Sequence, residues 1–311
     1  MVNTMMLVKK DLSFTPYDVQ WIPFSARVCA IGATGRSTGQ ISVYSLEGKQ
    51  LQFTNETEVP SIVRCGTFGA AESHSRHLAT GDFDGQLQIW DTSQFELPVV
   101  SVKAHESIIN AISGCNRGAR EIVTGSRDGA AKVWDTRQPK SAVFTARSKE
   151  KAQDIWAVAF GDLGHAEQRL VAVGYDNGDV KLFDLTASQY VWETNVGAGV
   201  CSLDFGTKSL AAGTLTGTCT IQLDSGIVSK IPSSGATVWS VRHMPQDVSY
   251  FANANGNGDV TVLHNATTDN PSVISVSQHP VTSFDWHKDK KGLFACSAFD
   301  QTIRIGLVQG I

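Results

Sequence analysis

Hydrophobic and polar residues alternate along this chain in short runs. The stretch Gln86-Leu87-Gln88-Ile89-Trp90 alternates with a period of two, which is the period of a β-strand with one buried face. Apolar residues do not recur every three to four positions over any long stretch, so we expect almost no helix. The pattern therefore predicts an all-β protein made of many short strands.

One sequence unit recurs along the whole chain. Residues 78–85 read LATGDFDG before QLQIWD, residues 122–129 read IVTGSRDG before AAKVWD, and residues 171–178 read VAVGYDNG before DVKLFD. Weaker copies place the same turn position 39 to 49 residues apart throughout the sequence. The seven turn residues are Gly39, Gly85, Gly129, Gly178, Gly217, Gly258 and Gln301. A period near 40–45 residues with a Trp-Asp dipeptide is the signature of a WD-repeat propeller.

Each unit predicts four strands. The Asp-Gly or Asn-Gly pair makes a tight hairpin between two strands, because Gly and Asn tolerate a positive φ. A further apolar segment opens each unit, and an outer strand follows the Trp-Asp position. The length of 311 residues would by itself suggest two domains, but seven such units use nearly all of it. We therefore expect one domain over residues 1–311, a seven-bladed β-propeller with four-stranded antiparallel blades.

The last unit lacks an outer strand. Its three inner strands fall at about 280–308, whereas the segment Met5-Met6-Leu7-Val8-Lys9 is spare at the start of the chain. We expect this N-terminal strand to complete blade seven, because closing the ring in this way removes free sheet edges.

Composition and charge exclude several classes of protein. A net charge of −4, from 26 basic and 30 acidic residues, argues against broad binding to nucleic acid or to an anionic membrane. No run approaches 18 apolar residues, so we expect no membrane span. The six cysteines are at least 18 residues apart and form no CxxC pair, so we interpret them as free, buried thiols in a reducing compartment.

Two common motifs of enzyme sites are absent from the sequence. It contains no GxxxxGK[ST] phosphate loop and no HExxH, so we expect no enzyme, no catalytic residue, no cofactor and no metal. His105, Ser126 (or Thr124), Asp128 and Trp134 match the polar positions of WD repeats. We interpret them as a structural hydrogen-bond set that satisfies buried polar groups, not as a catalytic group.

A propeller without catalytic chemistry serves as a binding platform. The position two before each turn residue lies on the top face, and the start of each inner strand lies at the mouth of the central channel. The first set is Phe83, Arg127, Asp176, Leu215, Gly256 and, by alignment, Phe299; the second is Arg64, Asn110, Trp156, Cys201, Trp239 and Thr282. Exposed Phe, Trp and Arg side chains suit a protein interface. For Trp156 and Trp239, burial between blades is an equally open alternative.

Longer strings go beyond the generic repeat. They include CGTFGA (residues 65–70), GYDNGDVKLFDL (174–185), TVWSVRHMPQ (237–246) and FDQTIR (299–304). These strings resemble one branch of the WD-repeat β-propeller family, the branch typified by Monad.

The resemblance implies a non-enzymatic cochaperone adaptor in the cytoplasm. It implies partners in a prefoldin-like assembly with RuvB-like AAA ATPases and a tetratricopeptide adaptor. Dynein heavy chains would be the clients, during preassembly of axonemal dynein arms, and in animals such proteins are linked to apoptosis. The propeller itself is then expected to be a monomer within larger complexes.

A second function is left open by one short motif. Residues 134–137 read WDTR, which resembles the box that docks substrate receptors on cullin-type ubiquitin ligases through Asp135 and Arg137. The same residues also arise in ordinary repeats, where the arginine pairs with a neighbouring acid.

Overall fold

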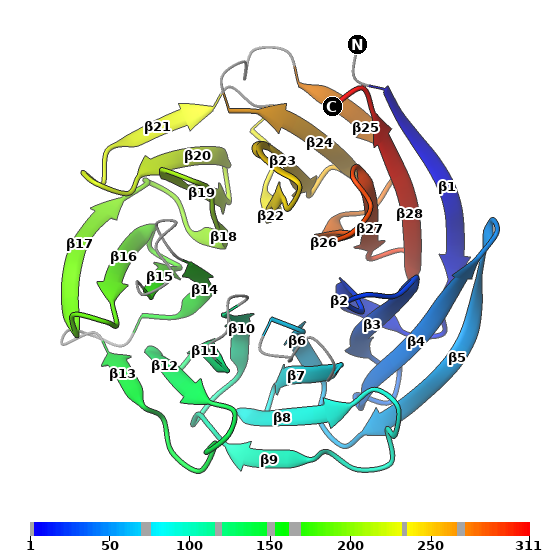
Figure 1. The fold of residues 1–311 in the computed structure, drawn as a ribbon, viewed down its shortest axis with the longest axis horizontal. Helices are drawn as coiled ribbons and strands as arrows, with labels where there is room; N and C mark the ends of the chain where they lie inside the picture. Colours follow the sequence, from blue (N-terminus) through cyan, green and yellow to red (C-terminus); the bar gives the residue numbers. More distant parts are fainter. Residues whose placement is uncertain are drawn as a thin grey trace.

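The computed structural model describes residues 3–69, 76–115, 120–147, 153–161, 169–231, 235–265 and 271–311. Within these ranges the chain forms 28 β-strands, β1 to β28, and no helix. The strands make seven four-stranded antiparallel sheets around a central axis (Figure 1). The all-β, seven-bladed propeller that the repeat predicts is therefore confirmed.

Each blade runs from an inner strand beside the channel to an outer strand at the circumference. Blades one and two are β2 (Thr15–Trp21), β3 (Arg27–Ala33), β4 (Gly39–Glu47), β5 (Gln50–Val59), and β6 (Val63–Thr67), β7 (His77–Asp82), β8 (Gln86–Asp91), β9 (Val100–Lys103). Blades three and four are β10 (Ile109–Gly114), β11 (Glu121–Ser126), β12 (Ala130–Asp135), β13 (Phe144–Arg147), and β14 (Ile155–Gly161), β15 (Leu170–Tyr175), β16 (Asp179–Asp184), β17 (Gln189–Asn195).

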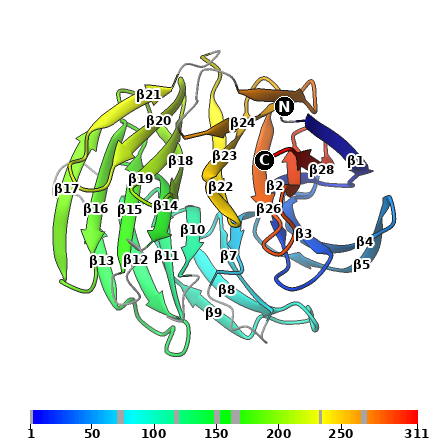
Figure 2. The same ribbon diagram turned by 45° about the horizontal axis from the view of Figure 1, so that its top comes forward.

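The remaining three blades follow the same order. Blades five and six are β18 (Val200–Phe205), β19 (Ser209–Thr214), β20 (Gly217–Gln222), β21 (Val228–Ile231), and β22 (Val238–Met244), β23 (Asp247–Asn255), β24 (Asp259–His264), β25 (Ser272–Ser275). Blade seven is β26 (Val281–Trp286), β27 (Leu293–Ala298), β28 (Thr302–Gln309) and β1 (Asn3–Asp11). Figure 2 shows inner strands of neighbouring blades, such as β14, β18 and β22, side by side.

The ring closes through the N-terminal strand, as expected. Strand β1 pairs antiparallel with β28, from Asn3 opposite Gln309 to Asp11 opposite Thr302. Figure 1 shows these two strands, blue and red, alongside each other in one blade. Val8 and Leu12 are buried in one apolar cluster with Ile303 and Ile305, so the N-terminal segment also contributes to the core.

The core consists of layers between adjacent blades. One cluster joins Leu170 and Leu182 of blade four to Leu203 and Ile221 of blade five, all nearly inaccessible to solvent. The second strand of each blade is covered on both faces by its neighbours, which explains its continuous apolar sequence. Leu170–Tyr175, which reads LVAVGY, is buried along its whole length.

The hairpin turns follow the repeat, with one correction. Gly85, Gly129, Gly178, Gly217 and Gly258 all have positive φ, and Gln301 adopts the same left-handed region at 59°. Gly39 does not; it is the first residue of β4, and the left-handed residue of that turn is Ser37, at φ 62°. The extra residues of GATGRSTG lengthen the turn, so the alignment at Gly39 was wrong by two positions.

Candidate protein-docking site at the channel mouth

The seven inner strands share one irregularity. Each skips one residue in its pairing with the second strand of its blade, close to its start. A bulge of this kind re-aims a side chain and commonly sits beside a functional site. The skipped residues are Tyr17, Arg64, Asn110, Trp156, Cys201, Trp239 and Thr282. All seven line one cavity of about 390 Å³ at the mouth of the channel.

The hairpin turns are held at fixed positions around this cavity. The N–H of Phe83 donates to the carbonyl of Ile62, two residues before the bulge, at 3.0 Å. The equivalent bond joins Arg127 to Ile108, Asp176 to Asp154, Leu215 to Gly199, Gly256 to Thr237, and Phe299 to Pro280. The rim is therefore tied to the inner strands by backbone contacts and is preorganised for binding.

From these repeat positions we expect seven residues to form the protein interface: Phe83, Arg127, Asp176, Phe299, Arg64, Trp156 and Trp239. The structure brings five of them together. Arg64, Phe83, Trp156, Trp239 and Phe299 all line the cavity, and Arg127 and Asp176 stand on the surrounding rim. The exposed fraction of Phe299 is 41%, whereas Phe83 and both tryptophans are half-buried. The tryptophans are thus neither fully buried between blades nor fully exposed.

Tyr17 is the mouth residue that sequence reasoning missed. Its ring stacks with Phe83 at a centroid distance of 6.1 Å and meets Phe299 edge-on at 6.3 Å. The guanidinium of Arg64 lies 5.5 Å from the centre of the same ring, within cation–π range. A signal was available: Tyr17 precedes Trp21 by four residues, as the bulge residue of blade seven precedes Trp286.

Charged groups at the rim and mouth differ in how they are paired. Arg127 Nε lies 3.3 Å from Asp154 Oδ2, and burial raises the pKa of that Asp154 carboxyl despite the arginine. Asp176 keeps one buried oxygen without a hydrogen bond. Arg64 forms no ion pair with any carboxylate in the part of the chain that the structure describes.

The thiol at the mouth is not activated. Burial raises the pKa of Cys201 to about 12, so its sulfur is protonated near neutral pH and is a poor nucleophile. All six cysteines are free, but only four are buried as expected, because Cys115 and Cys201 are half-buried. Among the described residues, no three His, Cys, Asp or Glu side chains are grouped as metal ligands would be.

The WD hydrogen-bond set forms in blade three with Thr124 as its hydroxyl. His105 Nδ1 lies 3.0 Å from Asp128 Oδ2, and His105 Nε2 lies 2.8 Å from Thr124 Oγ1. Thr124 Oγ1 accepts from Trp134 Nε1 at 2.9 Å. Ser126 is the correction: its hydroxyl donates to Ser107 O at 3.3 Å and accepts from the backbone N–H of Asp128 at 3.1 Å, whereas His105 and Trp134 bond to Thr124 instead.

Electrostatics fit a structural role for these side chains. Burial lowers the pKa of His105, so the ring is neutral, with the Nδ1 proton directed at the carboxylate. Burial alone would raise the pKa of Asp128, but hydrogen bonds from His105, Ala130 N–H and Glu106 N–H hold it well below its usual value. Blade seven has no such set on its corresponding residues, because Asp300 pairs with Arg304 at 2.6 Å and His279 is exposed.

Two side chains of the WDTR box, Asp135 and Arg137, pair with each other. Arg137 Nη2 lies 2.6 Å from Asp135 Oδ2, and Arg137 Nε lies 2.9 Å from Asp135 Oδ1. This two-pronged pair within one turn satisfies the arginine locally, which favours a structural origin for the motif.

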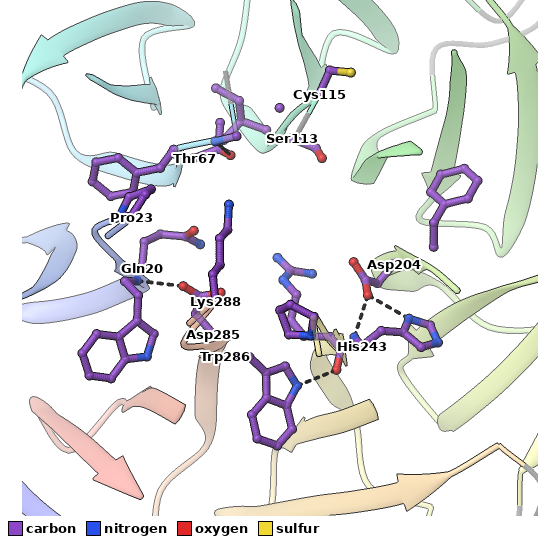
Figure 3. A pocket seen from close by; sticks show the side chains of 18 of the residues that line it. Gln20, Pro23, Thr67, Ser113, Cys115, Asp204, His243, Asp285, Trp286 and Lys288 are labelled. Carbon is purple, nitrogen blue, oxygen red and sulfur yellow. Dashed lines mark hydrogen bonds and ion pairs between the residues drawn. The ribbon is translucent and has the colours of Figure 1, made fainter. Parts of the chain in front are cut away.

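The opposite end of the channel holds a second, larger cavity of about 990 Å³ (Figure 3). Its acidic side chains hold neighbouring blades together: Asp285 accepts from Trp21 N–H at 2.7 Å, and Asp204 accepts from both His243 N–H and His243 Nδ1. These bonds satisfy the free edge of the next inner strand. Burial raises the pKa of Asp285 to about 7.

The seven blades, the Trp-Asp positions and the His105 set define a WD-repeat propeller. In agreement, the family described as "WD domain, G-beta repeat" matches residues 97–135 and 270–305. In the described ranges, no helix is long and apolar enough to cross a membrane.

Similar proteins place the chain more narrowly. It is 39% identical over 338 residues to dynein axonemal assembly factor 10 of Chlamydomonas reinhardtii, covering 96% of this chain and 94% of the relative. It is 39% identical over 339 residues to the Homo sapiens protein of that name, covering 97% and 95%, and 27% identical to that of Dictyostelium discoideum, covering 96% and 93%.

The chain belongs to the dynein axonemal assembly factor 10 family. The resemblance to WD-repeat proteins is thereby confirmed, and the relatives carry the name dynein axonemal assembly factor 10 and not that of Monad.

Proposed function

We propose that this protein is a non-enzymatic scaffold for the assembly of axonemal dynein, and that it docks partner proteins at the channel mouth. The observation that carries the proposal is the convergence of seven bulged positions on one cavity with half-buried aromatic side chains and Arg64. Aromatic and arginine side chains in a preorganised depression are the groups that dominate protein interfaces. The name shared by its relatives supports the cellular process.

The partners in this proposal are those that the sequence resemblance implies. In the cytoplasm, the propeller would act as one subunit of an assembly with RuvB-like AAA ATPases, a prefoldin-like complex and a tetratricopeptide adaptor. Dynein heavy chains would be its clients.

A replacement experiment tests the role and the site together. The chain is expressed in Chlamydomonas reinhardtii cells that lack their own dynein axonemal assembly factor 10, and dynein heavy chains are quantified in isolated axonemes. We expect the wild-type chain to restore them, and the double variant Trp156→Ala/Trp239→Ala to restore less than about a tenth, because truncating interface aromatics costs several kcal/mol of binding.

The matched control removes two exposed aromatics far from the mouth. Phe53 and Tyr190 lie on outer strands β5 and β17, with exposed fractions of 56% and 48%. Phe53→Ala/Tyr190→Ala should restore the heavy chains as the wild type does. Equal restoration by the mouth variant would reject the mouth as the docking site. Affinity purification that recovers neither RuvB-like ATPases nor dynein heavy chains would reject the proposed partners.

A further inference from the structure

We propose that the channel mouth recognises a carboxylate side chain, Asp or Glu, that stands beside an apolar side chain on a partner protein. Arg64 is the anchoring cation, and the rings of Tyr17, Phe83 and Phe299 receive the apolar neighbour. The inference rests on the proposed function of the mouth as a docking site and names the chemistry of what docks there.

The guanidinium of Arg64 lies at the mouth without a carboxylate partner among the described residues. The bulge in β6 directs its side chain to the mouth, where the guanidinium lies 5.5 Å from the centre of the Tyr17 ring and is half-buried. Within the described ranges, no Asp or Glu forms an ion pair with it. A partly desolvated guanidinium with unused donors interacts strongly with a carboxylate, because charge-assisted bonds gain strength where water is excluded.

The charges that line the cavity favour an anion. They are Arg64, Arg242 and Asp18. The Asp18 oxygens already accept from Gly66 N–H at 2.9 Å and from the Ser283 hydroxyl at 2.6 Å. The cavity is thus electropositive in a chain whose net charge is −4, so its charge does not follow from composition.

The size and lining of the mouth limit what can enter. A cavity of about 390 Å³ lies at the small end of ligand sites, which run from about 300 to 1,000 Å³. It has room for one or two side chains but not for a helix. The Tyr17 ring adjoins Arg64, and the Phe83 and Phe299 rings contact Tyr17 in turn, so an acidic residue and an apolar neighbour can bind together.

A carboxylate fits better than a phosphate. One planar guanidinium matches a carboxylate with two parallel bonds, whereas phosphorylated residues are generally bound by arginine clusters. Of the other arginines, Arg127 at the rim is paired with Asp154, and Arg242 in the cavity wall already donates to Ser202 Oγ at 3.2 Å and to Val241 O at 2.9 Å. Asp176 adds negative charge at the rim. The mouth therefore offers one guanidinium without an ion-pair partner, that of Arg64, close to apolar rings.

Selection from random peptides tests the inference without knowledge of the natural partner. Twelve-residue peptides displayed on phage are selected on the purified full chain, and the enriched sequences are synthesised with a fluorescent label for anisotropy titration. We expect them to share an Asp or Glu next to an aromatic or large aliphatic residue. Replacing the acid by its amide should weaken binding at least tenfold.

Variants of Arg64 test whether the acidic residue of the peptide binds to this side chain. Arg64→Gln should weaken binding of the acidic peptides at least tenfold, and Arg64→Lys, which keeps the charge but not the fork, should weaken it less. Arg64→Glu should bind a peptide whose acid is replaced by Lys better than it binds the original. Arg137→Gln, an exposed arginine paired with Asp135 in another turn, is the matched control and should leave Kd unchanged.

Each other result overturns the inference. Failure to enrich any peptide would do so, as would enriched peptides without an acid or acidic peptides insensitive to Arg64→Gln. A phosphoserine version that binds more than tenfold tighter would move the site to phosphorylated partners. None of these results touches the axonemal replacement experiment, so failure of the inference is distinguishable from failure of the proposed function.

Discussion

The carboxylate of Asp285 links two blades but lowers the stability of the folded protein when it is ionised. It lines the larger cavity, at the end of the channel opposite the mouth. Its carboxylate accepts a hydrogen bond from the N–H of Trp21, which links blade seven to blade one. Burial raises the pKa of Asp285 to about 7, although that hydrogen bond and the charges of Lys288 and Arg242 oppose the rise. The ionised form therefore disfavours the folded state near and above neutral pH.

At the residue scale, we predict that Asp285→Asn stabilises the protein at pH 8 and not at acidic pH. Because the pKa is raised on folding, the protonated Asp285 favours the folded state, an effect fully present below about pH 4 and lost as pH rises to about 7. Asn keeps the acceptor oxygen without the charge. The gain at pH 8 should be on the order of 2 kcal/mol, measured by urea denaturation.

The neighbouring Asp289 supplies the control, since it is exposed. Asp289→Asn should leave the denaturation midpoint unchanged at both pH values. An Asp285→Asn variant that is destabilised at both pH 5 and pH 8 would show that the carboxylate is needed as such.

At the element scale, the hairpin turns between the second and third strands are the most regular feature of the fold. The turn of blade seven differs from most of the others in lacking a glycine. Gln301 occupies at φ 59° the place that glycine holds in five other blades. A residue with a Cβ lowers the free energy of unfolding by about 1–2 kcal/mol when it adopts this conformation. Glycine avoids this strain but loses more conformational entropy on folding, which offsets part of the gain. We expect Gln301→Gly to raise the free energy of unfolding by about 0.5–1 kcal/mol in a denaturant titration.

The reverse exchange is the matched comparison. Gly258 has φ 92°, and a Cβ there would lie 2.0 Å from Ser277 O. Gly258→Ala should therefore destabilise by about 2 kcal/mol or more. If both variants shift the midpoint in the same direction, turn conformation is not what selects these residues.

At the scale of the whole molecule, stability depends on closure by β1. Its pairing with β28 spans Asn3 to Asp11, and Val8 and Leu12 are buried in the cluster between blades seven and one. Deletion of residues 1–12 exposes the edge of β28 and removes these side chains. We expect the Tm to fall by about 10 °C or more, at roughly 2–4 °C per kcal/mol for a chain of this size.

Thermal unfolding followed by circular dichroism measures this loss. Deletion of residues 1 and 2 alone leaves β1 intact and serves as the control. An unchanged melting curve after removal of residues 1–12 would mean that the ring is held without its N-terminal strand.

The sequence by itself determined the number of blades, the four strands of each and the strand that closes the ring. These follow from periodicity and turn chemistry, which are local and recur in every unit. Arg64, Phe83, Trp156, Trp239 and Phe299 line one cavity because equivalent repeat positions occupy equivalent places on a ring. Their role in binding a partner stays a prediction.

Only the tertiary structure decided which side chains meet. Thr124 and Ser126 are two residues apart on one strand and face the same side, so the sequence left both open; the position of Trp134 on the next strand selects Thr124. Tyr17 of blade one meets Phe299 because ring closure brings blade seven beside blade one, and it meets Phe83 from blade two on its other side. That Arg64 has no carboxylate partner among the described residues is likewise decided by packing, since pairing depends on distances that no repeat pattern contains.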